Sequence, residues 1–142
     1  MNHIKKLLSI FKQPRPQLDD NESVTCWKFD GLLKNLNVLS LPADRQKAIM
    51  GYGCIADEMA EDFNTYFTLN RQEYLEKGLL DQQQCDQLDK LDSLLEKYSG
   101  DGNTGFWDDQ QLDTNKDWQS VREIAKHILI VLRKDNSDIG YS

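Results

Sequence analysis

Two long stretches of the sequence place their apolar residues alternately three and four positions apart, which is typical of helices that pack against other helices. The first stripe consists of Ile49, Tyr52, Ala56, Met59, Phe63 and Tyr66, and the second consists of Trp118, Val121, Ala125, Ile128 and Leu132. Because the two stripes have the same period, we expect them to face each other within one core. Elsewhere no alternation of apolar and polar residues indicates strands. The sequence therefore predicts an all-α fold, a helical bundle of about four to six helices with short connections.

The clearest helix prediction begins at Pro42. Proline is favoured near the first helical position, and Asp44 follows in the first turn. The first apolar stripe then continues toward Leu69 as one helix. Gly51 and Gly53 lie inside it, and each weakens a helix by about 1 kcal/mol relative to alanine. We expect them to mark the close approach of a neighbouring helix.

Further helices are predicted on both sides of this one. Residues 27–39 keep helical spacing, and residues 70–73 have the form of a capping box before a short helix that Gly78 should end. Another helix should start at Asp81 and close at residues 99–100. Its apolar face consists of Cys85, Leu88, Leu91, Leu95 and Tyr98.

The last helix should follow a loop at residues 101–105 and begin around residues 114–117, a second capping-box pattern. Residues 128–132 are apolar without interruption, which predicts the most buried helix of the fold, with a strand as the alternative.

The N-terminus differs from the rest of the chain. Residues 4–11 have the spacing of a short amphipathic helix with a basic polar face, which could pack on the body or lie on a membrane. Residues 13–23 are predicted to form an extended polar connector. We expect residues 1–16 to form this basic helix and the start of a linker, and residues 25–142 to form a single helical bundle domain.

Charge is distributed unevenly along the chain. The 142 residues carry a net charge of −7. Residues 1–16 hold four basic side chains and no acidic one, which leaves −11 for the remainder. A body of this charge repels nucleic acid and anionic membranes and attracts basic proteins.

Cysteine usage and hydropathy bear on location. Cys26, Cys54 and Cys85 are widely spaced and form no C-x-x-C pattern, which argues against a disulfide framework and a zinc site. We expect Cys54 and Cys85 to be inert core thiols in a reducing compartment. The N-terminal apolar run is too short for a signal peptide, and no stretch approaches the roughly 20 apolar residues that span a bilayer. The predicted location is the cytoplasm, without stable membrane insertion.

Residues that could support catalysis form no recognisable set. Residues 101–103 resemble the start of a calcium loop, but its sixth and twelfth positions hold Phe106 and Leu112 instead of glycine and glutamate. Neither histidine follows a glutamate by three positions, as a di-iron bundle requires, and no glycine-rich phosphate loop is present. His127 follows Glu123 by four positions, which favours a structural pair over a catalytic base. The sequence predicts no metal, no cofactor and no enzyme activity.

Residues 57–62, in the segment that carries the first apolar stripe, contain four carboxylates: Asp57, Glu58, Glu61 and Asp62. They form two pairs four positions apart, and each pair places like charges on one helical face at a cost of a few tenths of a kcal/mol, about 0.2 to 0.5. The cluster is either a solvated helix face or an anionic surface for a cationic partner or a metal.

A second unusual segment places Phe106 and Trp107 directly before two acids, Asp108 and Asp109, with Asp113 shortly after. Trp107 is either an anchor of the core or an exposed contact for a basic protein surface, where a tryptophan flanked by carboxylates binds well. The candidate partner-binding residues are Asp57, Glu58, Glu61, Asp62, Trp107, Asp108, Asp109 and Asp113.

Residues 52–63, Phe106-Trp107, Leu112 and residues 117–125 together resemble small acidic helical immunity proteins of bacterial contact-dependent growth inhibition and related polymorphic toxin systems. The likeness covers roughly residues 40–132. It implies a cytosolic protein that binds one cognate toxin domain, often a basic nuclease, and blocks it by forming a stoichiometric complex.

Two other functions remain open on the sequence. One is a helical regulatory or adaptor module that docks on a protein partner or a membrane through its basic N-terminal helix. The other is an enzyme whose residues meet only in three dimensions. A toxin gene immediately upstream would favour the immunity function over the adaptor.

Overall fold

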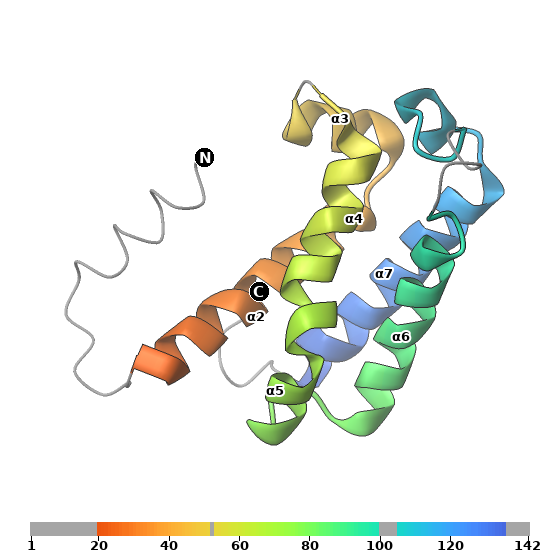
Figure 1. Cartoon of the computed structure of the whole chain (residues 1–142). Coiled ribbons are helices and arrows are strands. Elements are labelled where there is room, and N and C mark those ends of the chain that lie inside the picture. The colour runs from red at the N-terminus through yellow and green to blue at the C-terminus, as the bar shows by residue number, and fades with distance from the viewer. Residues whose placement is uncertain (1–19, 52, 100–104, 136–142) are drawn as a thin grey trace.

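The computed structural model describes residues 20–51, 53–99 and 105–135, and within these ranges it contains helices and no strand (Figure 1). The α-helices are α2 (Asp20–Leu39), α3 (Ala43–Met50), α4 (Ile55–Tyr66), α5 (Arg71–Glu76), α6 (Gln82–Glu96) and α7 (Lys116–Asp135). Two 3-10 turns are η1 (Thr68–Asn70) and η3 (Asp109–Leu112). The prediction of an all-α bundle is confirmed.

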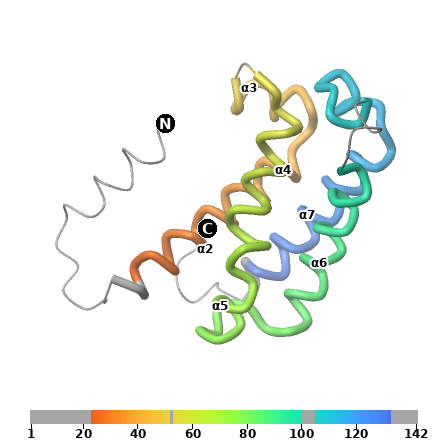
Figure 2. The backbone as a smooth tube through the Cα atoms, in the orientation of Figure 1, coloured from red at the N-terminus to blue at the C-terminus, as the bar shows by residue number. Residues whose placement is uncertain are grey.

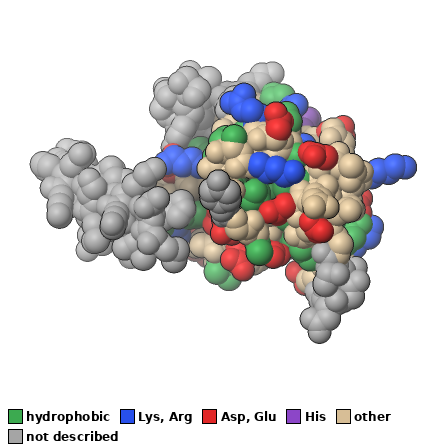
Figure 3. Space-filling view, turned by 90° about the horizontal axis from the view of Figure 1, so that it is seen from above, with side chains coloured by type: hydrophobic (Ala, Val, Ile, Leu, Met, Phe, Trp, Pro, Cys, Tyr) green, Lys and Arg blue, Asp and Glu red, His purple; other side chains and the backbone are tan. Residues whose placement is uncertain are grey.

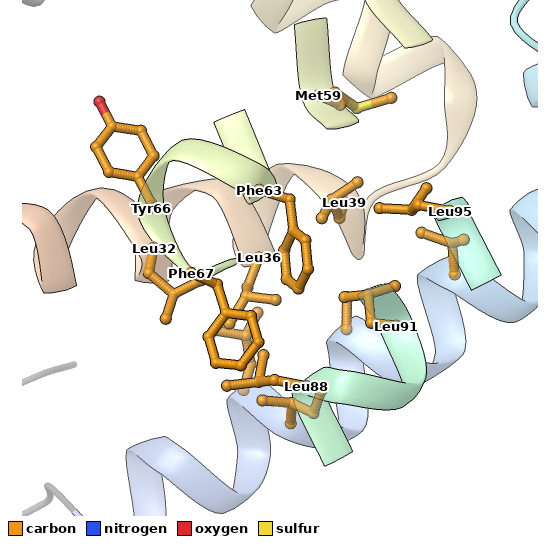
Figure 4. Close-up of a cluster of buried hydrophobic side chains, with 14 of the residues drawn as sticks. Leu32, Leu36, Leu39, Met59, Phe63, Tyr66, Phe67, Leu88, Leu91 and Leu95 are labelled. Carbon is orange, nitrogen blue, oxygen red and sulfur yellow. The ribbon is translucent and has the colours of Figure 1, made fainter. Parts of the chain in front are cut away.

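The four longest helices form a bundle in which each packs on two others. α2 packs on α4 and on α7, and α6 packs on α7 and on α4. In the view of Figure 1, α4 crosses in front of α2 and α6 lies in front of α7, and the backbone tube of Figure 2 follows the same arrangement. Figure 4 shows leucines of α2 and α6 packed around Phe63 of α4 and Phe67, which follows it. All of these labelled side chains are buried in one hydrophobic core.

The predicted long helix from Pro42 onward is two helices. α3 ends at Met50, and α4 begins at Ile55. Gly51 and Gly53 lie between them with φ angles of 82° and 118°, a backbone conformation that glycine adopts far more readily than other residues. The two glycines break the helix instead of receiving a neighbour.

The close approach predicted for those glycines occurs at Gly31 of α2. A Cβ atom there would lie 2.4 Å from Cε1 of Tyr66, so the missing side chain lets the Tyr66 ring lie directly on α2. The helix break also changes the first apolar stripe. Ile49 is 53% exposed on α3, and Leu69 is 72% exposed beyond α4; Tyr52 lies outside the described residues.

The second apolar stripe is buried as predicted, but its neighbours are different. Trp118, Val121, Ala125, Ile128 and Leu132 are all buried on α7. α7 packs mainly on α2 and α6, and α4 lies diagonally across the bundle. The predicted face-to-face packing of the two stripes is therefore wrong, because α2 supplies its own apolar residues between them. The run at residues 128–132 is helical, and Ile130 within it is 60% exposed, so this run is not buried all round.

Local signals at the helix ends give mixed results. Asp81 caps α6 in a full capping box with Gln84. Asn70 makes no cap; its side chain donates to the Thr65 carbonyl at 2.6 Å. Asn115 directly precedes α7 and caps it, because its Oδ1 accepts from the Asp117 backbone N–H at 2.8 Å, so Thr114 is not the capping residue.

Other predictions concern segments that the structure describes only in part. Residues 20–23, expected in an extended connector, belong to α2. The predicted helix at residues 4–11, connector residues 13–19 and loop residues 101–104 lie outside the described part of the chain. No helix within the described ranges has both the length and the apolar character needed to cross a bilayer.

Candidate partner-binding groove between α4 and α6

A groove of about 430 Å³ lies between α4 and α6, and Ser99 and Trp107 also line it. Its lining residues are Asp57, Ala60, Glu61, Phe63, Asn64, Thr65, Asp92, Leu95, Glu96, Ser99 and Trp107. The groove thus combines residues from three parts of the sequence that come together only in the folded chain.

The walls of the groove are acidic. α4 contributes Asp57 and Glu61, and α6 contributes Asp92 and Glu96. In each pair the two acids are four positions apart, which places them one helical turn from each other on the same face. No basic side chain is among the lining residues of this groove, which is formed by described residues throughout. Both walls of the groove therefore carry negative charge.

Glu61 and Glu96 are the two exposed acids of the groove walls, and Glu96 Oε1 accepts a hydrogen bond from Ser99 Oγ at 3.3 Å. Among the described residues no Lys, Arg or His forms an ion pair with either. Asp92 accepts a hydrogen bond from Thr68 Oγ1 at 3.0 Å. Glu61 and Glu96 are consequently the carboxylates best placed to pair with cations of a partner.

The base of the groove is apolar. Phe63 and Leu95 are core residues at 1% and 6% exposure, and Figure 4 shows both within the cluster of buried side chains. Ala60 and Trp107 are half-buried and pack against the same core. Because Phe63 and Leu95 are almost completely covered, an apolar side chain placed in the groove would chiefly contact Ala60 and Trp107.

Trp107 is held in place by several contacts. Its Nε1 donates a hydrogen bond to the Tyr98 carbonyl at 2.8 Å. Its ring meets Phe106 edge-on at a centroid distance of 4.8 Å and Trp118 at 6.1 Å. Trp107 is therefore an anchor of the fold, and the part of it that remains accessible faces the groove.

The end of α6 is fixed to the start of α7 beside this tryptophan. The Tyr98 ring stacks on Phe106 at 3.9 Å, and its hydroxyl donates a hydrogen bond to the Asp117 carboxylate. This hydrogen bond lowers the pKa of Asp117 and raises the pKa of Tyr98, because it stabilises the carboxylate and the protonated phenol together. These contacts join the part of the groove near Ser99 to Phe106 and to the first turn of α7.

Of the predicted partner-binding residues, the structure brings Asp57, Glu61 and Trp107 together in the groove. Glu58 is exposed and Asp62 is half-buried on α4, but neither lines the groove. The break before α4 also places Asp57 and Glu58 in its first turn, where negative charge is stabilised by the helix dipole. Part of the acidic cluster thus has a structural explanation.

The three remaining acids bond within the fold. Asp109 accepts from the Ile55 and Ala56 backbone N–H groups at 3.3 and 3.0 Å, and so caps the start of α4. Asp108 accepts from the Gln110 N–H at 3.0 Å. Asp113 lies 3.8 Å from Lys47 Nζ. On the face of the molecule that Figure 3 shows, acidic side chains lie among basic ones.

Sequence reasoning did not single out Asp92 and Glu96. A signal was available, since the two acids are four positions apart beside the apolar face of α6. Their relation to Asp57 and Glu61 requires the packing of α6 on α4, which periodicity alone does not give.

The other candidate reactive residues lie apart. His127 is exposed, and in the described part of the chain neither a hydrogen bond nor an ion pair joins it to Glu123, which accepts from Gln119 at 3.4 Å, so the expected pair is not formed. Cys85 is a buried thiol whose pKa is raised by burial, as predicted for a core residue. Cys54 is exposed, which corrects its assignment to the core. Among the described residues no cluster of three or more His, Cys, Asp or Glu could hold a metal ion.

Comparison with protein-family models, curated proteins and solved structures finds no match to this chain.

Proposed function

We propose that the protein is an immunity protein, which binds a basic toxin domain in the cytosol and neutralises it by forming a stoichiometric complex. The observation that carries this proposal is the groove between α4 and α6, with acids on both walls, an apolar base and no basic residue in its lining. The resemblance of residues 40–132 to immunity proteins adds to it.

Each part of the groove has a task in such a complex. Carboxylates on both walls attract a basic surface and accelerate the encounter with it. Apolar contact with the base slows dissociation, because a desolvated central contact contributes more to affinity than charges at the rim. Binding alone would therefore inhibit a toxin domain in the groove, without any reaction catalysed by this protein.

Co-expression with the product of the reading frame immediately upstream tests this function. We expect protection of the cells to rise with the molar ratio of this protein to toxin and to saturate near equimolar amounts, with a stable complex by size-exclusion chromatography. Protection at a far substoichiometric ratio would indicate turnover and refute the binding mechanism. Absence of both protection and complex would refute the immunity function and favour the adaptor.

Charge reversal in the groove should slow the association of this complex. In Glu61→Lys with Glu96→Lys, we expect the association rate constant at low ionic strength to fall about tenfold, because steering by the groove is reversed. Stopped-flow fluorescence measures this rate. The matched control is Glu76→Lys with Glu123→Lys, which changes exposed acids outside the groove by the same total charge. Equal slowing in both variants would show that only net charge matters.

A further inference from the structure

We propose that the groove receives about one turn of a basic amphipathic helix of the partner, with one large apolar side chain on the base and Lys or Arg side chains on both flanks. This inference rests on the proposed function only in taking the groove as the site of partner binding.

The size of the groove limits what it can hold. A helix with its side chains is about 10–12 Å wide and rises about 5.4 Å per turn, so one turn occupies on the order of 500 Å³. The groove has a volume of about 430 Å³. It is therefore smaller than one full turn and accommodates the side chains on one face of about one turn, while the rest of a bound helix would lie outside it.

The positions of the charges agree with this size. Glu61 on one wall and Glu96 on the other are exposed, and Ala60 and Trp107 are half-buried apolar residues of the same lining. A matching ligand needs cations on both sides of an apolar strip. A helix provides this when basic residues lie three or four positions before and after an apolar residue.

The walls favour a helix over an extended segment. An extended peptide gains much of its affinity by adding main-chain hydrogen bonds to an open strand edge. The groove is bordered by α4 and α6, whose interior backbone groups are already bonded within each helix. A bound helix satisfies its own backbone groups and brings only side chains to the contact.

Synthetic peptides test this occupant directly on the full chain. The probe is a 16-residue peptide with leucines on one helical face and lysines flanking them. One control is a peptide of the same composition, scrambled so that the leucines share no face, and another is spermidine, a cation without an apolar anchor. Calorimetry at low ionic strength gives affinity and stoichiometry, and circular dichroism gives the helicity of the bound peptide.

We expect the amphipathic peptide to bind at a one-to-one ratio, to become helical, and to bind about tenfold tighter than the scrambled peptide. In Glu61→Gln with Glu96→Gln, its affinity should fall about fivefold or more. In the matched control Glu76→Gln with Glu123→Gln, it should stay within about twofold. Circular dichroism of the free variants checks that both remain folded.

Three results would overturn the inference: no binding of the amphipathic peptide, equal binding of the scrambled peptide or spermidine, or binding without a gain in helicity. These results are distinguishable from failure of the immunity function. Toxin neutralisation without peptide binding would remove only the helical occupant. Peptide binding without toxin neutralisation would remove only the immunity function.

Discussion

Replacing Trp118 with alanine is expected to lower the free energy of unfolding by about 3 to 5 kcal/mol. Trp118 is fully buried on α7, and its ring stacks on Phe106 at a centroid distance of 4.5 Å. Its Nε1 donates a hydrogen bond to the Phe106 carbonyl at 2.8 Å. Alanine would leave a large cavity and an unpaired buried carbonyl. Urea denaturation monitored by circular dichroism measures the change.

Two further variants separate the causes of this loss. Trp118→Phe retains much of the ring volume but removes the N–H donor, so it should destabilise the protein less than alanine does. Ile130→Ala changes an apolar residue that is 60% exposed on the same helix, and its effect should stay within about 0.5 kcal/mol. Similar losses for Trp118→Ala and Ile130→Ala would show that the buried face of α7 has been misassigned.

Replacing Arg122 with methionine is expected to cost about 2 to 4 kcal/mol, since a methionine side chain donates no hydrogen bonds. Arg122 is 7% exposed on α7. Its Nε donates to the Leu41 carbonyl at 3.0 Å, and its Nη2 donates to the Leu112 carbonyl. Burial lowers the pKa of this guanidinium, and the negative charge of Asp113 acts in the opposite direction. Without Arg122, two carbonyls in separate connections lose their donor.

The comparison with lysine tests whether this geometry is the cause. A lysine ammonium is a single point donor and cannot span both carbonyls as the planar guanidinium does. Arg122→Lys should therefore recover less than half of the stability lost in Arg122→Met, and Arg45→Met, at an exposed position, should change it little. Full recovery by lysine in urea denaturation would indicate that only the positive charge is needed.

The sequence predicted the helical elements well where local signals decide them. The apolar faces of α6 and α7 follow from spacing alone, and the start of α6 follows from the capping residue Asp81. The break at Gly51 and Gly53 was missed because the apolar spacing continues across it. Two glycines within three residues allow positive φ angles, and this backbone effect outweighed the periodicity.

The candidate site was only partly predictable, for a different reason. Asp57 and Glu61 stand out by their local density of charge, and Trp107 stands out by its unusual neighbours. Asp92 and Glu96 become relevant only when α6 packs beside α4. Asp109 looked like a contact for a partner, whereas it accepts two backbone N–H groups at the start of α4. Such assignments depend on contacts between distant segments, which spacing along the chain does not encode.

The packing of α2 against α7 has a consequence for synthesis of the chain. α2 is the first described helix, and it packs against α7, which is the last. Arg122 reaches the Leu41 carbonyl across 81 positions of sequence. Contacts of such separation form late, after the loop that joins them is closed. We expect an emerging chain to keep one side of α2 exposed until α7 leaves the ribosome, so that nascent chains lacking α7 depend on chaperones and do not yet neutralise a toxin.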